Sequence, residues 1–166
     1  KSTVRSIVDE VKRRFGNVAL PAIMLEPGRS IVADAGLTVY TCTSVKNAGK
    51  TSYVAVDGGM PDNPRFALYE ASYKVRNVTR AAEEGTRLYT IAGRCCESGD
   101  LIQKNVSLPE TKRGDFIAVE TTGAYNYSMA SNYNRLPRPA VIMLDKNEEH
   151  IVVRRETFGD ILDNDL

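Results

Sequence analysis

The sequence has little of several residue types on which common classes of protein site depend. It contains no tryptophan, one histidine and three cysteines in 166 residues. Cys95 and Cys96 are adjacent, and neighbouring cysteines bridge only with strain, so a disulfide framework is not expected and a reducing compartment fits best. Ligand cysteines are usually two to four residues apart, and the lone His150 lies in an expected hairpin turn. We therefore predict no metal site.

A strong charge of either sign and long apolar runs are also missing. Lysine and arginine number 22 against 21 acidic residues, which gives a net charge of +1, and the mean hydropathy is −0.30. The basic residues are scattered, so there is no general electrostatic reason to bind nucleic acid or a membrane surface. No apolar run is long enough for a transmembrane span, and we expect no secretory leader. We expect a cytoplasmic, soluble protein.

The first 34 residues have a different character from the rest. Apolar residues recur three or four apart over 2–15, which predicts an amphipathic helix that ends at Gly16. The run Ile23-Met24-Leu25 is apolar on both faces, which predicts a strand buried on both sides, as in a parallel sheet. One helix and one strand cannot form a sheet. We therefore expect 1–34 to be the last part of an α/β domain whose other strands are missing.

From residue 35 onward, short runs rich in valine, threonine, tyrosine and isoleucine alternate with turn residues. Evenly spaced strands with polar turns indicate a mainly β, closed or nearly closed antiparallel barrel over 35–166. A short helix capped by Thr157 is expected near the end. The segment 37–59 should form a hairpin around Asn47–Lys50, and further strands are expected at 73–78, 87–94, 116–122, 138–145 and 149–154.

Three loop segments present residues suited to binding. In "EPGRS", Pro27 and Gly28 turn the chain sharply and expose backbone N–H groups, and Arg29 adds a cation for phosphate or carboxylate. In "DGGMPDNPRFALYEA", a helical turn would place Arg65 and Tyr69, four residues apart, on one face. The alternatives are an ordinary turn with a solvated arginine and a surface loop with a core tyrosine.

The third segment is "ETTGAYNYSMASNYN". Small residues beside Tyr125 would allow a flat ligand to approach, and a flexible polar loop is the alternative.

The stretch "IAGRCCESGDLI" is the most specific motif. Adjacent side chains of an extended segment point to opposite faces, so Cys95 and Cys96 cannot share one environment. If Cys95 packs inward, Cys96 faces a cleft, where a thiol can deliver a proton and Glu97 can bind an ammonium group. Two buried structural thiols are the alternative.

Taken in order, "LEPGRS", "DGGMPDNPRFALYEA", "GRCCESGD" and "TTGAYNYSMASNYN" resemble the signatures of the diaminopimelate decarboxylase family. These are pyridoxal-phosphate enzymes of the alanine-racemase-like class, fold type III, and the resemblance runs from about Ile23 to the end. It implies a (β/α)8 barrel followed by a C-terminal β-barrel. Residues 1–34 would then be the remnant of the first barrel, and 35–166 would be the second domain.

The resemblance implies decarboxylation of meso-diaminopimelate to L-lysine and CO2. The substrate's unreacting end carries a carboxylate, which Arg29, Arg65 and the Tyr69 hydroxyl would bind, and an ammonium group, which Glu97 would bind. Cys96 matches the family's proton donor.

The family's cofactor, pyridoxal 5'-phosphate, is implied as well. The resemblance assigns the phosphate end of the cofactor to Glu26, Pro27, Gly28 and Arg29, and contact with both cofactor and substrate to Tyr125. In this family the cysteine and glutamate come from one subunit and the cofactor lysine from the other, which implies a homodimer with shared sites. None of the lysines here has the flanking pattern of the Schiff-base lysine, so we predict that the chain alone is inactive.

Two other interpretations remain open. A relative acting on carboxynorspermidine, ornithine or arginine would share both domains, although Glu97 with Arg65 and Tyr69 favours a distal amino-carboxylate. A non-catalytic β-barrel that serves in binding or assembly is the alternative of a different class.

Overall fold

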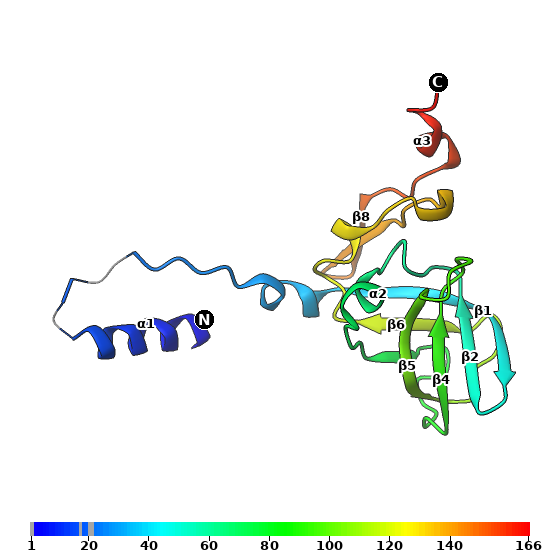
Figure 1. The fold of residues 1–166 in the computed structure, drawn as a ribbon, viewed down its shortest axis with the longest axis horizontal. Helices are drawn as coiled ribbons and strands as arrows, with labels where there is room; N and C mark the ends of the chain where they lie inside the picture. Colours follow the sequence, from blue (N-terminus) through cyan, green and yellow to red (C-terminus); the bar gives the residue numbers. More distant parts are fainter. Residues whose placement is uncertain (1, 17, 20–21) are drawn as a thin grey trace.

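The computed structural model describes residues 2–16, 18–19 and 22–166. Figure 1 shows a β-barrel-like body, a hairpin with a short helix beside it, and an N-terminal helix that lies apart from both. The elements are α1 Ser2–Phe15, β1 Leu37–Ala48, β2 Thr51–Val56, α2 Arg65–Tyr69, β3 Val75–Asn77, β4 Arg87–Ala92, β5 Leu101–Leu108, β6 Phe116–Glu120, β7 Val141–Asp145, β8 Glu148–Val153 and α3 Phe158–Leu162, with 3₁₀ turns at Gly28–Ser30, Ala33–Ala35, Tyr127–Met129 and Tyr133–Arg135.

Six strands form one sheet in the order β3-β6-β1-β2-β4-β5. Its two edge strands, β3 and β5, approach each other, so the sheet is nearly closed, as the sequence predicts. The prediction of a purely antiparallel barrel is wrong at one pair, because β2 and β4 run parallel. The chain between them, residues 57–86, is long enough for the crossover that a parallel pair requires.

The core of the barrel comes from alternating positions of its strands, as the period of two in a strand requires. Burying each large apolar side chain stabilises the fold by about 1.5–3 kcal/mol. The largest contributions come from Tyr40 and Cys42 on β1, Val54 and Val56 on β2, Tyr89 and Ile91 on β4, Ile102 and Leu108 on β5, and Ile117 and Val119 on β6.

Strand β5 is not among the strands expected from the sequence. Its middle is Gln103-Lys104-Asn105, and Asn105 has a φ of 55°, which breaks the alternation of apolar and polar residues. The register against β4 shifts in the same region. Such an irregular strand gives only a weak signal in the sequence, because a bulge moves its later side chains to the other face.

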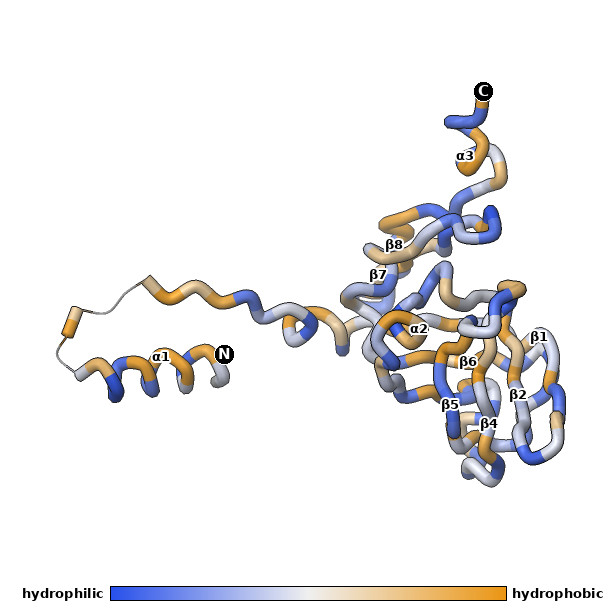
Figure 2. Tube along the Cα trace, viewed as in Figure 1, coloured by the Kyte–Doolittle hydropathy of each residue, from blue (hydrophilic) through white to orange (hydrophobic). Residues whose placement is uncertain are grey.

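The predicted helix over 2–15 is confirmed as α1, but the predicted strand at 23–25 is wrong. Residues 22–27 pair with no strand, and the side chain of Met24 is 90% exposed. A buried strand needs neighbours on both sides, and the described residues supply none. The apolar face of α1 is likewise uncovered, as the orange segments in Figure 2 show. Lys1, Asn17, Leu20 and Pro21, which belong to the predicted remnant 1–34, lie outside the described residues.

The C-terminal hairpin is tighter than expected. β7 and β8 are joined by Lys146 and Asn147, whose φ angles of 47° and 73° suit a two-residue turn. His150 therefore lies in β8 and not in the turn. The predicted cap of the last helix is confirmed, since Thr157 and Asp160 form a capping box at the start of α3. No described helix is long and apolar enough to cross a membrane.

A buried carboxylate fastens the end of the barrel opposite the C-terminal hairpin. Asp115 accepts hydrogen bonds at 2.9 Å from the Asn77 side chain, the Arg80 Nε and the backbone N–H of Lys112. Burial by itself would raise the pKa of the Asp115 carboxyl, but these three donors hold the pKa below its usual value. The ionised carboxylate therefore joins the end of β3 to the start of β6.

We expect Asp115→Asn to lower the free energy of unfolding at pH 7 by about 2–4 kcal/mol, because an amide nitrogen faces donors that a carboxylate oxygen accepted. The pKa of Asp115 is lower in the folded state. Its stabilisation is therefore complete above the unfolded value near 3.8 and is lost as the pH falls through the folded value. Urea unfolding at pH 7 and pH 3 should show a loss that shrinks in acid. The same change at the exposed Asp145 is the control, and an equal loss there would contradict the assignment.

Candidate functional site

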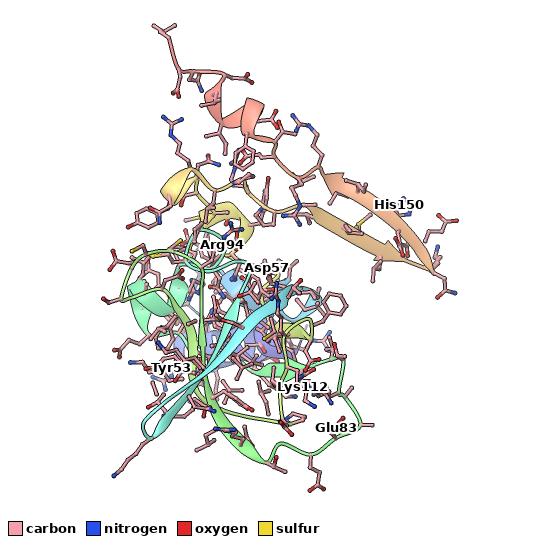
Figure 3. All side chains as sticks on the ribbon, turned by 90° about the vertical axis from the view of Figure 1, so that its right-hand side faces the viewer. Tyr53, Asp57, Glu83, Arg94, Lys112 and His150 are labelled. Carbon is pink, nitrogen blue, oxygen red and sulfur yellow. The ribbon has the colours of Figure 1, made fainter. Side chains whose placement is uncertain are left out.

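The loops that carry most of the predicted residues gather at one end of the barrel. In Figure 3, Arg94 and Asp57 mark the end that faces the C-terminal hairpin, whereas Glu83 and Lys112 lie toward the opposite end. Arg94 precedes the cysteine pair, and Asp57 precedes the segment that leads to α2. The backbone N–H of Arg94 donates to the Gly58 carbonyl at 2.9 Å, which joins these two loops directly.

The first group of predicted residues surrounds one guanidinium. The Arg65 side chain lies 5.3 Å from the ring centroid of Tyr69, because α2 places residues four apart on one face, as predicted. It also lies 5.5 Å from the ring of Tyr125, which comes from a loop 60 residues away. Nε of Arg65 is buried and has no hydrogen-bond partner among the described residues. The cation thus lies against aromatic faces, and no carboxylate among residues 2–16, 18–19 and 22–166 pairs with it.

The 3₁₀ turn at Gly28 reaches the same group. Gly28 has a φ of +57°, and a Cβ there would lie 3.3 Å from the Tyr125 hydroxyl, so both the conformation and the space favour glycine. Glu26, Pro27 and Arg29 are exposed on this turn. Tyr125 itself has a φ of 64°, an unusual conformation for a residue with a side chain and one that is often found at functional sites.

Gly123 has a different role from the one that the sequence suggested. A Cβ there would lie 2.1 Å from the Val32 carbonyl oxygen, and one on Gly36 would lie 2.4 Å from the Gly123 Cα. The backbone N–H of Gly123 donates to the Ala33 carbonyl at 3.0 Å. Gly123 therefore lets two backbones approach and fixes the "EPGRS" segment beside Tyr125. Its contacts are with the chain itself, and a flat ligand is not needed to explain it.

The second group lies in the bend after β4. Cys95 is half-buried, and burial together with the nearby Asp100 carboxylate raises the pKa of its thiol to about 11. Cys96 and Glu97 are exposed. The Tyr133 hydroxyl donates to Glu97 Oε2 at 3.4 Å, and the charge of Glu97 raises the pKa of Tyr133. The two cysteines thus differ in environment, although they lie in a bend and not in an extended strand.

The two groups remain separate within one chain. In the described part of the structure, no hydrogen bond or ion pair joins Glu97 to Arg65 or to Arg29. Within the part of the chain that the structure describes, the Arg29 side chain forms no hydrogen bond, ion pair or ring contact with either group, whereas Arg65 lies against two rings. Among the described residues, the charges of Arg65 and Glu97 therefore do not neutralise one another.

Several residues near the site were missed in the sequence. Asp100 is 3% exposed and accepts hydrogen bonds from Met60 and Cys95, and Tyr133 contacts Glu97. Buried Asn63 and Asn126 each have a side-chain N–H group without a partner among the described residues. Tyr133 and Asn126 fall in a segment noted for its tyrosines and asparagines. Asp100 and Asn63 stand within the quoted motifs. Asp100 was not singled out, because one of its two partners, Met60, is 40 residues away.

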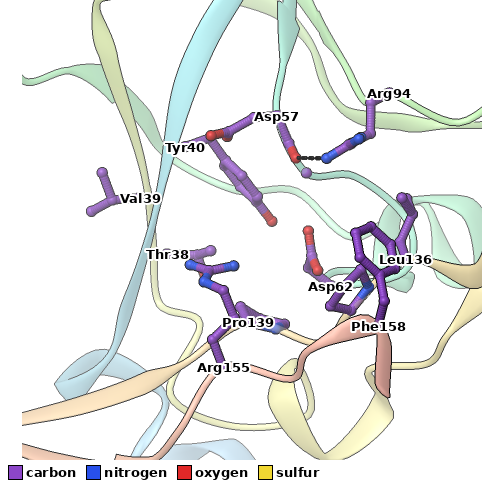
Figure 4. A pocket seen from close by; sticks show the side chains of 12 residues that line it. Thr38, Val39, Tyr40, Asp57, Asp62, Arg94, Leu136, Pro139, Arg155 and Phe158 are labelled. Atoms are coloured by element: carbon purple, nitrogen blue, oxygen red, sulfur yellow. Dashed lines mark hydrogen bonds between the residues drawn. The ribbon is translucent and has the colours of Figure 1, made fainter. Parts of the chain in front are cut away.

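A cleft of about 290 Å³ lies between the barrel and the C-terminal segment, and none of the predicted site residues lines it. Figure 4 shows Tyr40, Asp62 and Arg155 converging there, and Arg94 donating to the Asp57 carbonyl. Burial raises the pKa of Asp62, while Arg155 opposes that shift. The acidic and basic residues that line this cleft, Asp57, Asp62, Arg94 and Arg155, balance in number, so the cleft offers no unbalanced charge to a ligand. We therefore place the candidate site at the two groups described above. Within the described residues, no set of three or more histidine, cysteine or acidic side chains could hold a metal ion.

The different environments of the three thiols predict a fixed order of alkylation. Thiolates are the reactive species, and at pH 8 a thiol with a pKa of about 11 is ionised in only about one molecule in a thousand. Burial also raises the pKa of Cys42. Iodoacetamide should therefore modify the exposed Cys96 at least ten times faster than Cys95, because Cys95 is half-buried and is ionised in so few molecules. Peptide mapping by mass spectrometry measures both rates, and faster labelling of Cys95 would refute this order.

Comparison with known proteins gives the same identification at the level of sequence and of structure. A profile of the family described as "Pyridoxal-dependent decarboxylase, C-terminal sheet domain" matches residues 7–123. The diaminopimelate decarboxylase of Bacillus subtilis (strain 168) is 52% identical over 167 residues, which cover 98% of this chain and 38% of that protein. The chain thus spans well under half the length of this relative.

Solved structures share the fold. The diaminopimelate decarboxylase of M. jannaschii, in co-complex with L-lysine, superposes with a TM-score of 0.88 at 34% identity, over 98% of this chain and 37% of that one. A lysine/ornithine decarboxylase from Vibrio vulnificus, complexed with putrescine, gives a TM-score of 0.60 at 25% identity and covers 68% of this chain and 30% of that chain. The nearly closed sheet and the motifs at its end have the same explanation: this chain belongs to the pyridoxal-dependent decarboxylases and carries their C-terminal sheet domain.

Proposed function

We propose that this chain supplies the substrate-recognition and proton-donor part of a decarboxylase that converts meso-diaminopimelate to L-lysine and CO2. The observation that carries this proposal is the Arg65 guanidinium, which lies between Tyr69 and Tyr125 with a buried Nε that has no partner among the described residues. Such a group calls for an anion. The identity to diaminopimelate decarboxylases and the lysine complex of a relative support the choice of substrate.

The residues at the Gly28 turn fit the phosphate end of pyridoxal 5'-phosphate. The N–H groups of Gly28 and Arg29 precede the first hydrogen bond of the 3₁₀ turn, which runs from Ser30 to Pro27, and so have no backbone partner among the described residues. Free N–H groups, the Arg29 cation and the Tyr125 hydroxyl together suit a phosphate. Glu26 and Pro27 would border the same end. When bound, the cofactor supplies the electron sink that decarboxylation requires.

Recognition of the substrate's unreacting end divides between the two groups. Arg65, assisted by Arg29 and the Tyr69 hydroxyl, would bind its carboxylate, because a planar guanidinium can form two parallel hydrogen bonds with a carboxylate. Glu97 would bind its ammonium group and exchange the long contact with Tyr133 for a charged partner. An amine substrate without the distal carboxylate, such as ornithine, would leave Arg65 unpaired.

Cys96 would act as the proton donor. Cys96 is exposed beside Glu97, whereas Cys95 is half-buried. A thiol fixed next to the residue that binds the substrate's distal end can protonate one face of the carbon that has lost CO2. The stereochemistry of the product would then follow from the position of this loop.

We propose a homodimer with shared sites, as the resemblance of the motifs implies. Arg65, Tyr69 and Tyr125 would serve the site that the cofactor occupies, and Cys96 and Glu97 would reach into the site of the second subunit. We also propose that residues 1–34 complete a (β/α)8 barrel and that 35–166 form the C-terminal domain of a cytoplasmic enzyme. The uncovered apolar side chains of α1 and residues 23–25 would pack within that barrel.

We expect the complete protein, in which this chain is joined to the barrel that carries the cofactor lysine, to release CO2 from meso-diaminopimelate and not from L-ornithine or carboxynorspermidine. Arg65→Lys should lower kcat/KM for diaminopimelate at least 100-fold, because an ammonium lacks the planar fork of a guanidinium. The same change at the exposed Arg113 is the matched control. Preference for ornithine, or an Arg65→Lys enzyme as active as the Arg113→Lys enzyme, would disprove the substrate assignment.

A further inference from the structure

We propose that Asp100 is the positioning residue for the proton-donor loop, residues 93–100, which carries Cys96 and Glu97. Its carboxylate would connect this loop by hydrogen bonds to the segment that leads to Arg65. The inference rests on the proposed function, since it deepens the account of how Cys96 and Glu97 are placed. Asp100 would touch neither substrate nor cofactor. It would act through the backbone N–H groups of Met60 and Cys95, to which it is hydrogen-bonded.

The Asp100 carboxylate joins two loops that are distant in sequence. Its Oδ1 accepts a hydrogen bond from the backbone N–H of Met60 at 2.7 Å. Its Oδ2 accepts one from the backbone N–H of Cys95, also at 2.7 Å. Both bonds are short, as is typical of N–H donors to an ionised carboxylate. The buried Asp100 side chain therefore fixes the backbone of Cys95, next to Cys96, and the backbone of Met60, five residues before Arg65.

The loop is built around this carboxylate. Residues 93–100 connect β4 to β5, and the N–H of Gly93 donates to the Asp100 carbonyl at 2.8 Å where the two strands separate. Within the loop, the N–H of Asp100 donates to the Glu97 carbonyl at 3.0 Å. In the described residues, Asp100 supplies the only side-chain acceptor for a backbone N–H of residues 93–98. Without it, the Cys95 N–H would be left without its partner.

Two glycines make room for the carboxylate. A Cβ on Gly93 would lie 2.2 Å from both carboxylate oxygens, and one on Gly59 would lie 2.5 and 2.6 Å from them. Both distances are too short for real contacts, so any side chain at either position would displace Asp100. Gly99, in the same loop, has no atom within 4 Å of its would-be Cβ. The Asp100 carboxylate thus requires glycine at positions 59 and 93, which explains one glycine in each of the two motifs.

A carboxylate is required here, and an amide cannot replace it. Asp100 meets two N–H donors, one at each oxygen, and an asparagine side chain offers only one acceptor oxygen. Its NH₂ group would face either the Met60 or the Cys95 N–H. One loop would then be released, even though the shape of the side chain is retained.

The test uses the complete, cofactor-loaded protein with four variants in two matched pairs. Asp100→Asn is paired with Asp115→Asn, which also removes a buried carboxylate but lies at the other end of the barrel. Gly93→Ala, which crowds Asp100, is paired with Gly99→Ala, which does not. Backbone hydrogen exchange of residues 58–62 and 93–98 is measured by mass spectrometry, together with kcat, KM and thermal unfolding.

We expect Asp100→Asn and Gly93→Ala to speed exchange in both segments at least tenfold and to lower kcat/KM for diaminopimelate 10- to 100-fold, since a displacement of about 1 Å at reacting groups can cost this much. The loss should appear mainly in kcat, through Cys96, with a rise in KM through Glu97. Asp115→Asn should lower the unfolding temperature without either change, and Gly99→Ala should behave like the wild type.

The outcomes separate the two proposals. If the wild-type protein does not decarboxylate diaminopimelate but exchange rises in both segments only for Asp100→Asn and Gly93→Ala, the proposed function fails and the tie through Asp100 stands. If the wild type is active and either variant keeps kcat/KM within twofold, the inference is overturned. Unchanged exchange in both segments overturns it whatever the activity. A purely structural role, with lower stability but normal kcat and KM in Asp100→Asn, does the same.

Discussion

The arrangement of the site depends on one unpaired cation. The Arg65 guanidinium is partly buried between two tyrosine rings, and no carboxylate among the described residues neutralises it. Leaving a buried charged donor without a partner costs free energy, so a fold keeps such a group only where surrounding structure holds it. Here α2 fixes Arg65 against Tyr69, and the strained backbone of Tyr125 brings the second ring. Among the described residues the fold thus leaves this cation without a carboxylate of its own, which fits the anion site proposed above.

Glycines allow the close packing that brings the loops together near Arg65. Gly36 and Gly123 allow the segment after the Gly28 turn to lie on the Tyr125 loop, and Gly59 and Gly93 leave the space that Asp100 fills. Each of these contacts requires a residue without a side chain, and its partner comes from another part of the chain. The glycines therefore act as packing positions, and the polar residues beside them gain their fixed geometry from these contacts.

Features that depend on neighbouring residues could be predicted from the sequence, and those that depend on distant partners could not. The helix over 2–15, the hairpin around Gly49, the stacking of Arg65 on Tyr69 and the Thr157 cap all follow from local periodicity and turn chemistry. The parallel pairing of β2 with β4 follows only from where the crossover returns. The expected strand at 23–25 failed for the same reason, because apolar character cannot form a strand without neighbours in the described structure.

The candidate site shows the same division. Motif resemblance selected Cys96, Glu97, Arg65 and Tyr125, yet it could not identify Asp100, whose two bonds span 40 and 5 residues. A carboxylate next to a glycine and an apolar run is ordinary in any sequence. Only the folded chain shows that both of its oxygens are occupied by backbone donors.

The absence of an ion pair between Arg65 and Glu97 in the described structure has an electrostatic consequence. If Arg65 and Glu97 lay within about 4 Å in one chain, they would attract each other by several kcal/mol at an effective dielectric constant near 20 and would neutralise one another. A zwitterionic ligand would then have to break that pair before binding. Among the described residues each charge has only neutral partners, two rings for Arg65 and one hydroxyl for Glu97. Both charges therefore stay available for the zwitterionic substrate proposed above, which would pair them in place of a direct ion pair.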